Sequence, residues 1–193
     1  MLVKVITIDF NFACAELAEK IKQSYQPEVI VGIATGGQFV AQILSEQMNI
    51  PLAIVKKQRP MTKIKNKIRL DLVLKKLPYV VSNILRVLET KFNEYRYEKN
   101  KSSVSYNDIS VEWIKGSFTF LASFNKILIV DDSIDSGKTL YLVKRFIEMN
   151  LDDKVEIKTA VLNQTFKNPL INSDFLLDKN VIYRFPWSKD TKG

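Results

Sequence analysis

Short apolar runs alternate with amphipathic segments in the first and last thirds of the chain. Residues 29–34 (VIVGIA) and 126–130 (KILIV) are mostly apolar runs rich in β-branched residues, as expected for buried strands of a parallel sheet. Residues 9–25, 36–49 and 138–150 place apolar residues mostly three and four positions apart, which predicts helices. This alternation predicts an α/β fold with a mostly parallel sheet and flanking helices.

Three further runs extend the predicted sheet to about five strands. They are residues 51–57, 155–162 and 180–185. The order of strand 29–34, helix 36–49 and strand 51–57 is a β-α-β unit, which implies a right-handed crossover between parallel strands.

The middle of the chain, residues 58–120, interrupts this pattern. Residues 71–99 are predicted to be helical over much of their length, and Pro78 is expected to mark a first turn or a break. Residues 109–121 are predicted to form a strand or a hairpin. We therefore expect one domain over residues 1–193, with residues 58–120 as an atypical helical insertion or lid that carries an apolar stripe (Val80, Val81, Ile84, Leu85, Val87, Leu88 and Phe92).

Composition excludes several kinds of chemistry. The 193 residues contain no histidine and one cysteine, Cys14, so a Ser-His-Asp triad, a histidine zinc site and an intrachain disulfide are impossible. No apolar stretch approaches the ~20 residues of a membrane span, and no targeting signal is recognisable. A cytoplasmic location without a membrane span is expected.

The sequence ILIVDDSIDSGKTL, residues 127–140, carries the strongest chemical signal. A buried strand ends in Asp131 and Asp132, and a helix begins near Gly137. Ligands of open parallel sheets bind beyond the carboxyl ends of the strands, and a helix N-terminus suits a phosphate. Two carboxylates beside a phosphate site favour hydroxyl groups or a metal, and a phosphate with a vicinal diol describes a ribose phosphate. A Walker A loop is rejected because its first glycine would fall at Asp132.

This motif resembles the phosphoribosyl-pyrophosphate (PRPP) signature of type I phosphoribosyltransferases, and it is most similar to the 6-oxopurine branch. Residues 29–52 resemble the pyrophosphate loop, helix and following strand of that family, and residues 185–187 (FPW) resemble the C-terminal ending of its small members. The resemblance implies the type I phosphoribosyltransferase fold with a small hood. It also implies transfer of phosphoribose from PRPP to a base, with a 6-oxopurine as the expected acceptor.

The resemblance implies a role for each residue of the motif. Asp131 and Asp132 would hold the ribose hydroxyls, and would contact Mg²⁺ only indirectly, through the magnesium complex of PRPP. Asp135 would be the general base or hydrogen-bond acceptor near the purine N7. The 5-phosphate would be held by residues 135–139, namely Asp135, Ser136, Gly137, Lys138 and Thr139.

The pyrophosphate would be bound by Thr35, Gly36 and Gly37. The family often has a cis peptide in this loop, which would fall at Ala34–Thr35. Thr35 stands where the family usually has lysine or arginine, and the candidates to replace that charge are Lys56, Lys57 and Arg59.

The base-binding half departs from the family pattern. Asn163, Gln164 and Thr165 occupy the region of the lysine that reads the purine oxygen, and Lys167 lies slightly later. An aromatic residue that stacks on the base is expected near residues 180–183. The candidate base contacts are Lys167, Val181 and Tyr183.

The net charge of +8 is unevenly distributed, because residues 56–101 hold 14 Lys and Arg against 4 Asp and Glu. Such a segment attracts polyanions. It is interpreted as a solvated lid whose apolar stripe forms a homodimer, as an enlarged mobile loop that closes over PRPP, or as a nucleic-acid or membrane-surface patch. Two alternatives to a purine transferase follow: a PRPP- or nucleotide-sensing regulator that binds nucleic acid, and a transferase for a non-purine acceptor.

Overall fold

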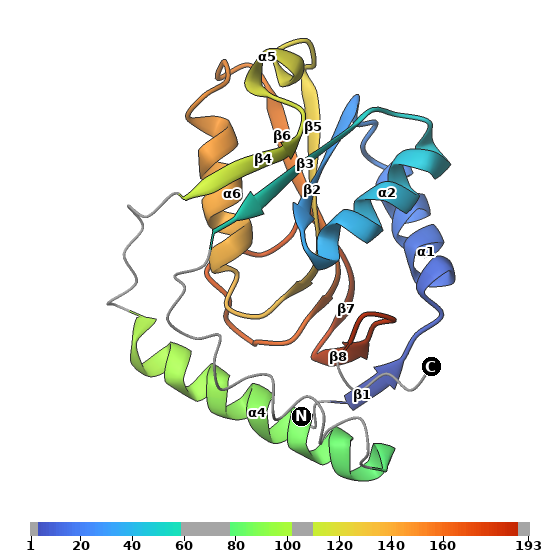
Figure 1. Cartoon of the computed structure of the whole chain (residues 1–193), viewed down its shortest axis with the longest axis vertical. Helices are drawn as coiled ribbons and strands as arrows, with labels where there is room; N and C mark the ends of the chain where they lie inside the picture. Colours follow the sequence, from blue (N-terminus) through green and yellow to red (C-terminus); the bar gives the residue numbers. More distant parts are fainter. Residues whose placement is uncertain (1–3, 59–77, 102–109, 189–193) are drawn as a thin grey trace.

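The computed structural model describes residues 4–58, 78–101 and 110–188. A six-stranded sheet runs through its centre in the order β4-β3-β2-β5-β6-β7 (Figure 1). All neighbouring strands are parallel except β3 and β4, which pair antiparallel. The strands are β2 (Val29–Ala34), β3 (Leu52–Lys57), β4 (Val111–Lys115), β5 (Lys126–Ile134), β6 (Glu156–Gln164) and β7 (Phe175–Lys179).

Two hydrophobic cores cover the two faces of this sheet. Helices α1 (Phe10–Lys22) and α2 (Gly36–Met48) pack on one face. Helices α6 (Lys138–Glu148) and α5 (Phe118–Leu121) pack on the other. The central strands β2 and β5 are buried on both sides, which explains why their sequences are continuous apolar runs. The predicted α/β fold with a mostly parallel sheet is confirmed.

Helix α1 illustrates how local sequence sets an element. Its buried side chains recur three and four residues apart and face the first core, as an amphipathic surface helix requires. Its start is fixed by Asp9, whose carboxylate accepts a hydrogen bond of 3.1 Å from the Phe12 N–H.

A second, two-stranded sheet pairs the two ends of the described chain. Strand β1 (Lys4–Thr7) runs parallel to β8 (Val181–Arg184), with Lys4 opposite Val181. This pair corresponds to the small hood expected from the resemblance. It lies beside the edge of the main sheet where the parallel strands end (Figure 1).

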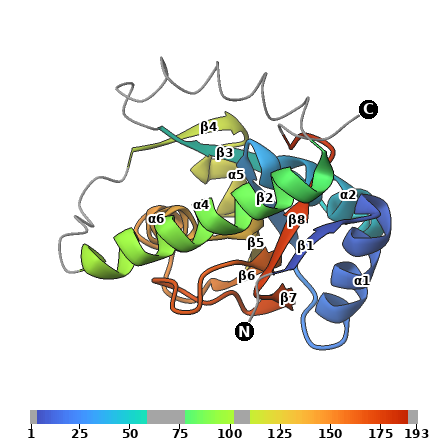
Figure 2. The same ribbon diagram turned by 90° about the horizontal axis from the view of Figure 1, so that it is seen from below.

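Helix α4 (Tyr79–Lys99) lies across that same edge of the molecule, as the view from below shows (Figure 2). Pro78 immediately precedes α4, in agreement with the expectation that it marks the start of a helix. Much of the apolar stripe of α4 is exposed in the single chain, with Val80 at 70%, Leu88 at 58% and Phe92 at 59%. The homodimer and the lid expected for residues 58–120 stay predictions.

The structure corrects several predicted boundaries. Strand β5 continues to Ile134, so Asp131 and Asp132 lie within the strand and not at its end. Within residues 109–121, β4 is followed by the short helix α5 instead of a hairpin. The main sheet has six strands, against about five predicted: it gains β4 and the missed β7, whereas predicted strand 180–185 forms β8 of the two-stranded sheet. Strand β1 was also missed, since both are short and lack a long apolar run.

Arg184 fastens α4 to the hood. Its side chain is 4% exposed, and its Nη2 donates to Asn83 Oδ1 at 2.7 Å and to Ser82 Oγ at 3.1 Å. Its guanidinium also lies over the Tyr79 ring, 4.3 Å from the centroid. These partners all belong to α4, so Arg184 links this helix to β8. Leaving a buried cation without such contacts would cost folding free energy.

We expect Arg184→Ala to lower the free energy of unfolding by about 2–3 kcal/mol, because charged hydrogen bonds of a buried side chain and a cation–π contact are lost. Urea unfolding followed by circular dichroism measures the change. The matched control is Arg145→Ala, which removes a half-exposed arginine paired with Glu148 and should cost less than about 1 kcal/mol. Equal effects of the two substitutions would contradict the assigned role of Arg184.

Candidate functional site

A cavity of about 550 Å³ lies where β2 and β5 end and α6 begins. It gathers almost the whole predicted PRPP motif on three neighbouring segments. Its lining includes Thr35, Gly36, Asp131, Asp132, Asp135, Ser136, Gly137, Lys138 and Thr139. We call it the phosphoribosyl cavity. Its position at the carboxyl ends of parallel strands is where open α/β sheets bind ligands.

Two helices begin at this cavity without a side-chain cap among the described residues. Thr35 precedes α2 and Gly137 precedes α6, and neither position makes a side-chain cap hydrogen bond. In α6 the Lys138 N–H donates to Ser136 Oγ at 3.4 Å, but the cap residues themselves leave the other first N–H groups without a side-chain cap. The helix dipole adds partial positive charge at both N-termini. Lys138 contributes a full positive charge at the start of α6. This end of the cavity is suited to phosphate groups.

Gly137 has a left-handed backbone with φ of 73°. A β-carbon at this position would lie 3.1 Å from backbone atoms of Ile171 and 3.2 Å from the Leu170 nitrogen. The Leu170 N–H also donates to the Ser136 carbonyl at 2.8 Å. Glycine is thus required by both conformation and space, and the loop is held against residues 170–171.

The two aspartates are packed directly against the glycine loop. A β-carbon on Gly36 would lie 1.9 Å from Asp132 Oδ2, and one on Gly37 would lie 2.6 Å from the Asp131 Cα. Gly37 is buried behind the cavity surface and does not line it. The peptide between Ala34 and Thr35 is cis, as the resemblance implied. The segments predicted to bind pyrophosphate and ribose are therefore in contact.

Trp187 is a site residue that the sequence analysis did not assign. It lines the phosphoribosyl cavity, and its indole Nε1 donates to Asp132 Oδ2 at 3.3 Å. Its ring stacks on Phe39 and Phe185, each with centroids 4.9 Å apart. The resemblance of residues 185–187 (FPW) to the family pointed to this tryptophan. A sequence pattern does not show that its indole would contact Asp132.

Burial has the largest influence on the Asp132 carboxyl, and it raises the pKa of this group above its ordinary value. Hydrogen bonds that involve Asp131, Trp187 and the backbone act in the opposite direction and only partly offset it. Burial removes water from this carboxylate and so disfavours its charged form. Groups with a pKa shifted in this way are common at functional sites.

Asp135 is held by a residue that was noted but given no role. The Thr165 hydroxyl donates to Asp135 Oδ1 in a short hydrogen bond. The Thr165 N–H donates to the Ile134 carbonyl at 2.8 Å. The residue that follows β6 therefore orients the Asp135 carboxylate, the candidate general base.

The predicted base contacts are not brought to this cavity. Lys167 lines a separate cavity beside α4. Tyr183 is buried in the first core, and its hydroxyl donates to Asp178. Val181 is half-buried, and its carbonyl accepts from Asn163 Nδ2 at 2.8 Å. The role of Val181 and Tyr183 in base binding stays a prediction.

The lysines expected to replace the missing loop charge lie at the end of β3. Lys56 pairs in register with Ala34, directly beside the glycine loop, and Lys57 follows it. Neither lines the phosphoribosyl cavity. Arg59 lies outside the described residues.

The donor set fits magnesium that arrives with a ligand. Mg²⁺ is commonly bound by one or two carboxylates together with substrate phosphates. Asp131 and Asp132 supply two carboxylates, while the described residues contain no group of three or more acidic, cysteine or histidine side chains able to hold a metal. Within the described ranges, no helix is long and apolar enough to cross a bilayer.

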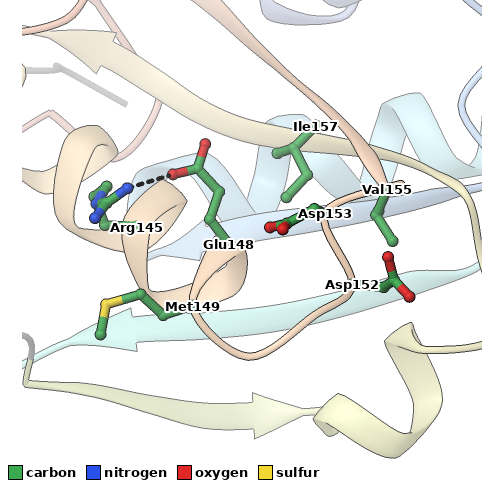
Figure 3. A pocket seen from close by; sticks show the side chains of 7 residues that line it. All are labelled: Arg145, Glu148, Met149, Asp152, Asp153, Val155 and Ile157. Carbon is green, nitrogen blue, oxygen red and sulfur yellow. Dashed lines mark hydrogen bonds and ion pairs between the residues drawn. The ribbon is translucent and has the colours of Figure 1, made fainter.

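A different cavity, of about 490 Å³, opens at the far end of α6 (Figure 3). Its lining includes three acids, Glu148, Asp152 and Asp153, with Arg145 bonded to Glu148 at 3.4 Å. Carboxylates and a helix C-terminus repel phosphate, so this end of the molecule is unsuited to a phosphoribosyl ligand.

We expect Asp132→Asn to raise the free energy of unfolding at pH 7 by about 1 kcal/mol. The raised pKa means that the folded chain holds the Asp132 proton more tightly than the unfolded chain, so the ionised carboxylate destabilises the fold near neutrality. This destabilisation disappears as the pH falls below the ordinary carboxyl pKa of about 4, because the group is then protonated in both the folded and the unfolded chain. Urea unfolding of both proteins between pH 4 and 8 measures this.

The control is Asp153→Asn at the far end of α6, where a change within about 0.5 kcal/mol is expected at every pH. A loss of stability in Asp132→Asn at pH 7 would show that the charged carboxylate is held favourably.

Comparisons with known proteins agree with this geometry. Residues 6–67 match the phosphoribosyl transferase domain family. No curated protein matches the chain significantly. Among solved structures, a purine phosphoribosyltransferase from Pyrococcus horikoshii superposes with a TM-score of 0.56 at 21% identity, over 97% of this chain and 95% of that one.

Two further structures are similar at lower identity. The xanthine-guanine-hypoxanthine phosphoribosyltransferase of Helicobacter pylori has a TM-score of 0.58 at 14% identity, over 93% of this chain and 89% of that one. A hypothetical protein from Neisseria gonorrhoeae with bound ppGpp has a TM-score of 0.54 at 16% identity, over 97% of this chain and 90% of that one. At these identities the likeness establishes the fold. Residues 6–67 are thus similar to the phosphoribosyl transferase domain, and the chain as a whole has the fold of type I phosphoribosyltransferases.

Proposed function

We propose that this protein transfers the 5-phosphoribosyl group from Mg-PRPP to a nitrogenous base and releases pyrophosphate. The observation that carries the proposal is the convergence of Asp131, Asp132, the 135–139 loop and the glycine loop around one cavity. These segments supply, side by side, acceptors for a diol and two helix N-termini for phosphates. A 6-oxopurine is the proposed acceptor class.

In the proposed reaction the bond from the anomeric carbon to pyrophosphate breaks, and the pyrophosphate leaves with the bonding electron pair. A ring nitrogen of the base forms the new bond to that carbon through an oxocarbenium-like state. Asp131 and Asp132 bind the ribose hydroxyls and hold the sugar in place. The N-termini of α2 and α6 stabilise the negative charge of the leaving pyrophosphate and of the 5-phosphate.

Asp135 receives the proton that the base loses as the carbon–nitrogen bond forms. Thr165 orients its carboxylate through the short hydrogen bond to Oδ1. With no histidine in the chain, a carboxylate beside the cavity is the natural proton acceptor. Magnesium bound with PRPP would add positive charge at the pyrophosphate.

A second candidate is a nucleotide-sensing regulator of the same fold. The likeness to the Neisseria protein with bound ppGpp favours it, as does the charge of +10 within residues 56–101. A regulator would bind nucleotides without turnover. Its affinity for RNA or DNA would depend on the nucleotide and would fall steeply with salt.

The test of the reaction is pyrophosphate release from Mg-PRPP with hypoxanthine, guanine, xanthine, adenine, uracil or orotate, each supplied alone. Release with a 6-oxopurine (hypoxanthine, guanine or xanthine) is the expected outcome, and release with adenine alone would contradict the acceptor class. Release with a pyrimidine would contradict the acceptor class. An absence of release with every base, combined with a rise in melting temperature on adding PRPP, would favour the regulator.

The double variant Asp131→Asn with Asp132→Asn should weaken Mg-PRPP binding by at least about 100-fold, because two charged hydrogen bonds to the ribose are lost. Isothermal titration calorimetry with Mg-PRPP measures the affinity, and Asp153→Asn serves as the control. Unchanged affinity would remove the two aspartates from the proposed site.

Asp135→Asn should lower kcat by about 100-fold while changing the Kd of PRPP by less than about threefold. The amide retains an oxygen that can accept the Thr165 hydrogen bond but cannot take up a proton. Steady-state kinetics and calorimetry on the same preparation separate these effects. Equal losses of turnover and of PRPP affinity would contradict the role of Asp135 as the base.

A further inference from the structure

A second cavity, of about 490 Å³, lies between α4 and the segments that follow β6 and β7. We call it the α4 cavity. Helix α4 crosses the molecule in front of the strands in the view from below (Figure 2), and its residues line one side of this cavity. The lining residues are Lys91, Glu94, Tyr95 and Glu98 from α4, with Thr165, Lys167, Asn168 and Asn180 opposite.

The α4 residues of this wall share one face of the helix. Lys91, Glu94, Tyr95 and Glu98 are spaced three and four residues apart, which aligns their side chains along a single stripe. The apolar stripe of α4 has no such run of charges. The wall is therefore a distinct polar surface of this helix.

Direct contacts hold this part of α4 against the chain beyond β6. Glu94 Oε1 accepts the Lys167 N–H at 2.7 Å, and Lys101 Nζ donates to the Asn168 carbonyl at 3.4 Å. The rings of Tyr97 and Phe166 pack with centroids 5.8 Å apart. The cavity thus has two walls fastened to each other rather than one free helix.

The α4 cavity adjoins the phosphoribosyl cavity through one hydrogen bond. Thr165 lines the α4 cavity and donates to Asp135, which lines the phosphoribosyl cavity. The α4 cavity is therefore separated from the phosphoribosyl cavity, at this point, by the Thr165–Asp135 pair alone.

The two cavities differ in charge. The α4 cavity carries two ammonium groups, Lys91 and Lys167, and two carboxylates, Glu94 and Glu98, so its lining is neutral overall. Carboxylates oppose a phosphate, whereas alternating donors and acceptors suit a neutral heterocycle. Ammonium groups match a ring carbonyl oxygen, and carboxylates match ring N–H and amino groups.

We infer that the α4 cavity binds the acceptor base and that Glu94 and Glu98 determine its specificity. The chemical class that fits is an amino-substituted oxo base, with a carbonyl beside N–H and amino donors, as in guanine. A base with an oxo group in place of the amino group would direct an oxygen at a carboxylate and is disfavoured. This inference rests on the proposed function, since it names the acceptor of that reaction.

The test compares guanine, hypoxanthine and xanthine as acceptors at saturating Mg-PRPP. The wild-type protein should give the highest kcat/KM with guanine and the lowest with xanthine. Glu94→Gln and Glu98→Gln should each lower kcat/KM for guanine about tenfold and that for hypoxanthine, which lacks the amino group, by less than about threefold. The Kd of Mg-PRPP should stay unchanged.

The matched control is Glu89→Gln, an exposed position of α4 outside the cavity lining, which should leave all three values unchanged. Melting temperatures of the three variants check that each is folded. A preference for xanthine, or guanine kinetics unaffected by both cavity substitutions, would overturn the inference.

Binding of GMP and XMP by calorimetry separates this inference from the proposed reaction. Without turnover on any base, GMP binding that weakens in Glu98→Gln would keep the α4 cavity as a base site while the transferase proposal fails. Turnover with guanine that is indifferent to Glu94→Gln and Glu98→Gln would keep the transferase and reject the α4 cavity.

Discussion

The close packing of two glycines against two aspartates is the constraint on which the rest of this site depends. Gly36 and Gly37 leave no room for a β-carbon beside Asp131 and Asp132. Strand β2 and helix α2 are thereby fixed against the end of β5 at van der Waals distance. The same contact brings a helix N-terminus beside paired carboxylates, so groups of opposite electrical character face one ligand.

The linings of the two cavities differ in charge. The phosphoribosyl cavity combines two helix N-termini with a lysine and two aspartates. The α4 cavity balances two lysines with two glutamates. A charged sugar phosphate and a neutral ring are chemically unlike, and the Thr165–Asp135 hydrogen bond lies at the boundary where they would be joined.

The parallel core and the segments lining the phosphoribosyl cavity could be predicted from sequence, because buried strands, a glycine turn and paired acids are local signals. Residues 29–34 were assigned with the boundaries that β2 has. Strands β1 and β7 were missed because short strands depend on partners distant in the chain. The contacts of Trp187 with Asp132 and of Thr165 with Asp135 span 55 and 30 residues, and no local pattern encodes them.

The placement of α4 outside the main cores has an evolutionary consequence. Its cavity wall is built from exposed or half-exposed side chains, and substitutions at such positions usually change the folding free energy by less than about 0.5 kcal/mol. The glycine–aspartate contact, in contrast, tolerates no added atom. Selection could therefore alter this wall repeatedly at little cost in folding free energy, while the glycine–aspartate contact stays fixed.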